Sequence, residues 1–160
     1  MTEPWLRGKI PDTDPVIGYL LRSSQHIRED IAGLTEAEFN LKHLAGSTDR
    51  LCSYLEGNQL TPEQMASMAR ENEPGGDAAT WIAAVNQSLD RYEAIISNLK
   101  PEQFGDIREV GRRRLQTTAI GLAIHIVEHG QRHTGQALTT RGARTPACRV
   151  ETHLDAPPNP

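Results

Sequence analysis

The sequence has few of the features that mark specialised classes of protein. It contains only two cysteines among 160 residues, and aromatic residues make up 4% of the chain. Cys52 and Cys148 are too few and too far apart for a disulfide framework or a close-spaced metal pair. The apolar runs, such as "AIGLAI", are far shorter than the roughly 20 residues that cross a bilayer. The N-terminus "MTEPWLRGK" has no apolar stretch typical of a secretory signal. We therefore expect a cytoplasmic protein with no membrane partner.

The charge is also unremarkable. Charged residues make up 24% of the chain, and the formal net charge is −4. Such a chain has no general electrostatic affinity for nucleic acid, so no nucleic-acid partner is expected. A chain of this length most simply forms one core. We expect a single domain over residues 1–142, followed by a polar, proline-containing tail over residues 143–160.

Four segments have the apolar period and the terminal signals of long helices. They run from Asp14 to Leu34, from Thr35 to Gly57, from Asp77 to Leu99 and from Thr117 to Gly142. The capping signature Thr61-Pro62-Glu63-Gln64 predicts a short extra helix between the second and third long helices. Residues 101–116 lack a helical period and are expected to form a hairpin-like excursion around Gly111. The predicted fold class is therefore all-α, a four-helix bundle with one short additional helix.

The most informative stretch is "HIVEHGQRHTGQ", residues 125–136, which holds three of the six histidines. His125, His129 and His133 are four residues apart, so they lie along one face of the expected helix. Two imidazoles in this spacing can reach the same metal ion, about 2.0–2.1 Å from each nitrogen. From the residues alone, a metal site and a coincidental column of histidines are equally good interpretations.

Two motifs overlap in this stretch. The H-x-x-E-H sequence from His125 to His129 resembles an inverted zinc-peptidase signature, in which Glu128 would be the general base. Such a site needs a third protein ligand, usually an acid that follows later, and only Glu151 and Asp155 are available. This disfavours the peptidase hypothesis. Glu128 and Arg132, four residues apart, are better interpreted as a surface ion pair.

The second motif is more specific. "GLAIHIVEHGQRHTGQAL" and "FNLKHLAGSTDRLCSYLEG", together with "VGRRRLQTTAIGL", resemble the DinB/YfiT-like superfamily over roughly residues 14–142. The resemblance implies a four-helix bundle in which one histidine of the second helix and two of the last helix bind a divalent metal. Carried over by motif, the ligands are His43, His129 and His133. The resemblance also implies a homodimer.

Four further residues are assigned to the surroundings of this site. His125 is about 12 Å from His133 along a helix axis, so it is expected beside the site rather than as a ligand. Gln136 either orients an imidazole or hydrogen-bonds a ligand, although a packing role fits equally well. Gly135 is expected to allow close helix packing. Arg112 begins a three-arginine run that is usually solvated, but it would bind a substrate anion if the excursion covers the site.

Three neutral imidazoles would leave an open coordination position, which is typical of catalytic sites. The resemblance implies a metal-dependent enzyme, specifically a thiol-dependent S-transferase that joins a low-molecular-weight bacterial thiol to an electrophilic small-molecule substrate. Zinc and nickel are the leading candidates for the ion, and imidazoles also suit copper or iron. The alternative is a non-catalytic, metal-binding stress-response bundle that acts through dimer or partner contacts. No catalytic group is identifiable from the sequence.

Overall fold

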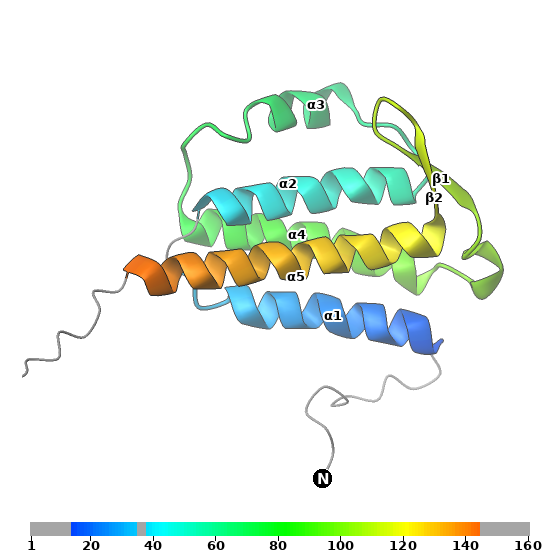
Figure 1. Ribbon diagram of the computed structural model, residues 1–160, viewed down its shortest axis with the longest axis horizontal. Helices are drawn as coiled ribbons and strands as arrows, with labels where there is room; N and C mark the ends of the chain where they lie inside the picture. Colours follow the sequence, from blue (N-terminus) through cyan, green and yellow to red (C-terminus); the bar gives the residue numbers. More distant parts are fainter. Residues whose placement is uncertain (1–13, 35–37, 145–160) are drawn as a thin grey trace, which may run out of the picture.

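A computed structural model describes residues 14–34 and 38–144. The described residues form five α-helices and one two-stranded sheet, shown in Figure 1. The elements are α1 (Pro15–Ile31), α2 (Glu38–Leu55), α3 (Pro62–Ala69), α4 (Ala78–Ser97), β1 (Ile107–Val110), β2 (Leu115–Thr118) and α5 (Ala119–Arg144), with a 3-10 turn at Pro101–Gln103. The prediction of an all-α bundle is confirmed, and α3 is the short extra helix.

The helix starts follow from local capping. The Asp14 carboxylate accepts hydrogen bonds from the first amides of α1, and the Asp77 carboxylate caps α4 in the same way. Thr61 forms the expected reciprocal capping box at the start of α3. Thr35, the cap expected for the second helix, lies outside the described residues. Gly57 terminates α2 because its φ of +87° is easily reached only by glycine.

The expected end of the last helix lies too early in the sequence. We expect Gly142 to follow the helix, but α5 continues to Arg144. A single glycine costs a helix only about 1 kcal/mol relative to alanine, so it does not by itself stop one. The part of the expected tail from residue 145 onward lies outside the described residues, so the division into domain and tail stays a prediction.

The four long helices pack as a closed bundle. Both α1 and α2 contact α4 and α5, so α1 and α2 lie diagonally opposite each other. The chain direction of α1 and α5 is opposite to that of α2 and α4 (Figure 1). The helix α3 lies over α2, and the hairpin closes one end of the bundle. No helix in the described ranges is long and apolar enough to span a membrane.

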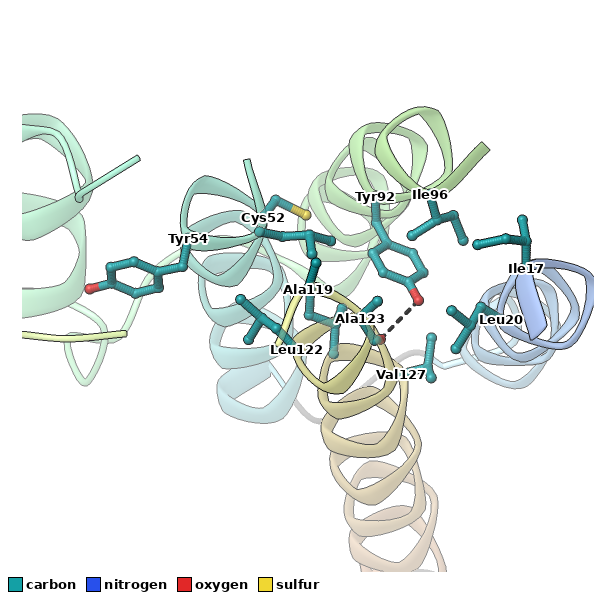
Figure 2. Close-up of a cluster of buried hydrophobic side chains, with 12 residues drawn as sticks. Ile17, Leu20, Cys52, Tyr54, Tyr92, Ile96, Ala119, Leu122, Ala123 and Val127 are labelled. Atoms are coloured by element: carbon teal, nitrogen blue, oxygen red, sulfur yellow. Dashed lines mark hydrogen bonds between the residues drawn. The ribbon is translucent and has the colours of Figure 1, made fainter. Parts of the chain in front are cut away.

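The core consists of two apolar clusters, one at the hairpin end and one at the opposite end of the bundle. Figure 2 shows the first, in which Tyr92 is fully buried and its hydroxyl donates to the carbonyl of Ala123 at 2.9 Å. Cys52 is buried in the same cluster, and burial raises the pKa of its thiol to about 12. This residue is therefore a neutral, packed side chain and not a nucleophile.

The excursion between α4 and α5 is an antiparallel hairpin, as predicted. Its strands pair from Ile107 opposite Thr118 to Val110 opposite Leu115. The turn includes Gly111, whose φ of +72° favours glycine. The guanidinium of Arg108 donates from Nε to the carbonyl of Leu55 at 2.7 Å, which attaches the hairpin to the end of α2.

Candidate metal centre

The structure brings together His43 of α2 and His129 and His133 of α5. Each of the three offers one nitrogen, and these nitrogens all lie within 4.8 Å of one another. Nε2 of His129 and Nε2 of His133 are 3.2 Å apart. The ring of His43 is 5.4 Å from that of His129 and 4.4 Å from that of His133, centroid to centroid. The three residues form one compact cluster.

The cluster has the chemistry of a divalent-metal site. Two nitrogens bound to a tetrahedral ion at 2.0–2.1 Å lie about 3.3 Å apart, close to the separation of the His129 and His133 Nε2 atoms. Burial, followed by the charges of neighbouring groups, lowers the pKa of His129 to about 4. Burial also lowers the pKa of His133. Both imidazoles are therefore neutral near pH 7, which is the form that binds metal.

The two α5 imidazoles also have unsatisfied polar atoms. Nδ1 of His129 and Nδ1 of His133 are buried without a hydrogen-bond partner of good geometry among the described residues. Buried polar atoms of this kind call for an explanation, because most are paired in folded proteins. A metal bound through Nε2 would leave the proton on Nδ1, so the metal itself would not satisfy these two atoms.

Gly130 permits the close approach of α5 to α1 and α2 beside His129. A Cβ atom on Gly130 would lie 2.6 Å from Cδ1 of Ile27 on α1 and 3.7 Å from Cδ1 of Leu44 on α2. Gly130 directly follows His129, and Leu44 directly follows His43. The expectation that Gly135 allows this packing is wrong, because a Cβ there would meet nothing within 4 Å. The packing glycine was missed because both glycines lie on one helix and only the tertiary structure shows which faces a neighbour.

His43 has charged neighbours that the sequence does not indicate. Its Nδ1 lies 3.1 Å from a carboxylate oxygen of Glu71, in the segment between α3 and α4. The other carboxylate oxygen of Glu71 accepts a hydrogen bond from Arg50 at 3.0 Å. Neither residue belongs to a recognisable motif with the histidines, and no local period connects them. Glu71 also lines a cavity of about 390 Å³ between α2, α4 and this segment.

Two residues of the peptidase motif, His125 and Glu128, are at the surface. His125 is 49% exposed, and its ring is 5.8 Å from that of His129. Glu128 is 60% exposed and accepts a hydrogen bond from Arg132 at 3.0 Å, as expected for a surface ion pair. Among the described residues, the possible metal-holding group contains His129 but neither His125 nor Glu128. Glu151 and Asp155 lie outside the described residues.

Gln136 and Arg112, the other residues predicted near the site, have different surroundings. Gln136 is a hydrogen-bond partner of the His133 side chain, and this contact raises the pKa of His133 against the larger effect of burial. Arg112 lies in the hairpin turn, where it borders a cavity of about 360 Å³ together with Tyr54. Tyr54 is about 16 Å from His43 along α2. A role for Arg112 at the metal site stays a prediction.

Comparison with known proteins agrees with the cluster. The family model of the DinB superfamily matches residues 37–137, a span that includes all three clustered histidines. No curated protein and no solved structure matches the chain. The matched span covers most of α2 through α5, the elements that build the cluster. The chain belongs to the DinB superfamily.

Proposed function

We propose that this protein binds a divalent transition-metal ion through His43, His129 and His133. The observation that carries the proposal is the meeting of three imidazoles from two helices, with one nitrogen of each within 4.8 Å of the others. Membership of the DinB superfamily supports the same assignment. Zinc and nickel are the leading candidates, because imidazole nitrogen suits both ions.

We further propose that the protein is a metal-dependent enzyme, a thiol-dependent S-transferase that uses a low-molecular-weight thiol and a small electrophile. A divalent ion with three neutral ligands would supply an open position and Lewis acidity that lowers the pKa of a thiol. The chain contributes the burial that keeps His129 and His133 neutral and the packing that orients them. The cavity of about 390 Å³ beside Glu71 has a volume suited to a small molecule, although its lining includes none of the three histidines.

The proposal also includes a cytoplasmic location and a homodimer. Both come from the family resemblance and the sequence. Size-exclusion chromatography with light scattering would test the dimer directly, and a monomer at all concentrations would contradict it.

Metal binding is tested first, by elemental analysis of the purified protein and by calorimetric titration of the metal-free form with Zn²⁺ and Ni²⁺. His43→Ala, His129→Ala and His133→Ala should each weaken binding by at least tenfold, because each removes one ligand. His26→Ala on α1 is the control and should bind like the wild type. Unchanged binding by the His129→Ala and His133→Ala variants would show that the ligand assignment is wrong.

Activity is tested next, by incubating the metal-loaded protein with common bacterial thiols and a small electrophile and measuring conjugate formation. Conjugation that disappears in His129→Ala supports the transferase. A protein that binds metal but forms no conjugate with any of these thiols supports the non-catalytic alternative instead. Peptide hydrolysis that depends on Glu128 would revive the peptidase hypothesis, and its absence would eliminate it.

A further inference from the structure

The carboxylate of Glu71 lies between an imidazole of the histidine cluster and a guanidinium. Oε2 of Glu71 is 3.1 Å from Nδ1 of His43, and Oε1 accepts from Nη2 of Arg50 at 3.0 Å. The side chains of Glu71 and Arg50 are 14% and 12% exposed, so water competes little for these contacts. Each carboxylate oxygen therefore has its own protein partner.

This contact determines which nitrogen of His43 carries the proton. A glutamate carboxylate at neutral pH only accepts hydrogen bonds, so the facing Nδ1 must be the donor. Nε2 then keeps its lone pair, and a neutral imidazole in this tautomer binds metal through Nε2. A carboxylate that holds the far nitrogen of a metal-binding histidine fixes the ring and increases the basicity of the ligand. We propose that Glu71 is the positioning residue of His43, and that Arg50 holds Glu71 in place. This proposal rests on metal binding by His43, His129 and His133.

The surroundings of Glu71 are shaped for this contact. A Cβ atom on Gly46 would lie 2.9 Å from Nη1 of Arg50 and 3.0 Å from Oε1 of Glu71. The absence of a side chain at this position on α2 therefore makes room for the ion pair beside the helix. A methyl group there would push the ends of both flexible side chains away and leave the helix backbone undisturbed.

The backbone on both sides of Glu71 is attached to α2 as well. Nζ of Lys42 donates to the carbonyl of Arg70 at 3.1 Å and to that of Glu73 at 2.5 Å. Lys42 directly precedes His43, so one turn of α2 supplies both the imidazole and the anchor for the segment that contacts it. The position of Glu71 relative to His43 is thus determined by several independent contacts.

Glu71 also places negative charge near the cluster. Three neutral imidazoles do not compensate the charge of a divalent ion, and a carboxylate behind one of them reduces the net charge of the site. Its influence reaches a second ring: burial lowers the pKa of His133 most, and the charge of Glu71 acts in the opposite direction. Among the described residues, the Nδ1 atoms of His129 and His133 have no comparable acceptor. The close contact of Glu71 is therefore with His43, although its charge also acts on His133.

The first test is the dissociation constant for Zn²⁺, measured by competition with a chromophoric chelator. Glu71→Ala should weaken binding by about 10- to 100-fold, the usual effect of removing such a partner. Glu71→Gln should have a smaller effect, because the amide oxygen still accepts from Nδ1. Gly46→Ala should weaken binding several-fold by displacing the pair. Glu73→Gln removes an exposed carboxylate two residues away, keeps the backbone carbonyl that Lys42 contacts, and should change nothing. Affinities of Glu71→Ala and Gly46→Ala within twofold of the wild type would overturn the proposal.

The second test uses the metal-free protein and separates this proposal from the proposed function. Two-bond proton–nitrogen NMR correlations distinguish the two tautomers of a histidine. His43 should carry its proton on Nδ1 in the wild type and shift toward the Nε2 tautomer in Glu71→Ala. If the wild type binds no metal, the proposed function fails. The tautomer measurement still decides whether Glu71 positions His43. If Glu71→Ala does not fold, Gly46→Ala provides the comparison because it displaces the ion pair, and a tautomer unchanged from the wild type in that variant contradicts the proposal.

Discussion

Gly130 of α5 faces Ile27 of α1 so closely that a Cβ atom on the glycine would lie 2.6 Å from Cδ1 of the isoleucine. Ile27 is fully buried, so its terminal methyl group cannot move away without displacing other core side chains. The contact lies one residue from His129. The same close approach thus determines both the packing of the bundle and the position of a candidate metal ligand.

Gly130→Ala should therefore destabilise the protein and weaken metal binding. Overpacking of a core costs about 1–3 kcal/mol, which exceeds the gain of about 1 kcal/mol from replacing glycine by alanine in a helix. Gly135→Ala is the matched control on the same helix, and it should be neutral or stabilising because the site is open. Urea denaturation and Zn²⁺ titration of both variants would check this. Equal stabilities would contradict the packing role of Gly130.

Tyr92→Phe should lower the free energy of unfolding by about 1 kcal/mol, because it removes the buried hydrogen bond to the carbonyl of Ala123 without changing the ring. Tyr19 is 64% exposed, so Tyr19→Phe should change stability by less than about 0.5 kcal/mol. Denaturant titrations give both values. Metal affinity should be unchanged in both variants, and a large loss of affinity in Tyr92→Phe would show that the core couples to the site.

The stability of the metal-free protein should fall as the pH decreases from about 6.5 toward 4. Burial is the main cause that lowers the pKa of His129 to about 4 in the folded state, against 6.5 for an ordinary histidine, and the charges of His133 and other neighbours act in the same direction. Between these values the unfolded chain binds a proton that the folded chain does not, so acidification favours unfolding. Above about 6.5 both states are neutral, and this contribution no longer changes with pH.

His129→Gln should reduce this pH dependence, because the variant lacks the group with the depressed pKa. Urea midpoints of the metal-free wild type and variant at pH 7, 6 and 5 would show it, since the other titrating groups are common to both. Parallel loss of stability in the two proteins would rule out His129 as the source. Metal binding should also weaken in this pH range, because protons compete for the same nitrogens.

Cys52 should be unreactive in the folded protein. Burial raises the pKa of its thiol to about 12, so almost no thiolate is present at pH 8. In a Cys148→Ser background, a thiol reagent should modify Cys52 only after denaturant is added. The rate of reaction should follow the rate of unfolding. Rapid modification under native conditions would show that the cluster around Cys52 opens locally.

The helices could be predicted well because their signals are local. Asp14, Thr61 and Asp77 cap helices through hydrogen bonds to amides two or three residues away, which depend on nearby sequence alone. The end of the last helix was placed incorrectly, because Gly142 is compatible with both a helix interior and a helix end. The hairpin was predicted from the absence of a helical period and from the glycine at its turn.

The candidate site could be predicted only in part. The spacing of His129 and His133 places both on one face of a helix, whatever surrounds that helix. The addition of His43 came from the family resemblance, and the structure brings the three rings together. Glu71 was missed, because it reaches His43 from a segment between two helices and shares no period with it.

The sequence by itself determined where the helices lie, which faces are apolar and which histidines of the last helix share a face, because these properties repeat over 3.6 residues. Only the tertiary structure decided that α2 lies beside α5 in the opposite direction, that Gly130 rather than Gly135 is packed, and that Glu71 meets His43. The physical reason is that contacts between distant segments depend on the packing of whole helices and on the path of the loops, which no local pattern encodes.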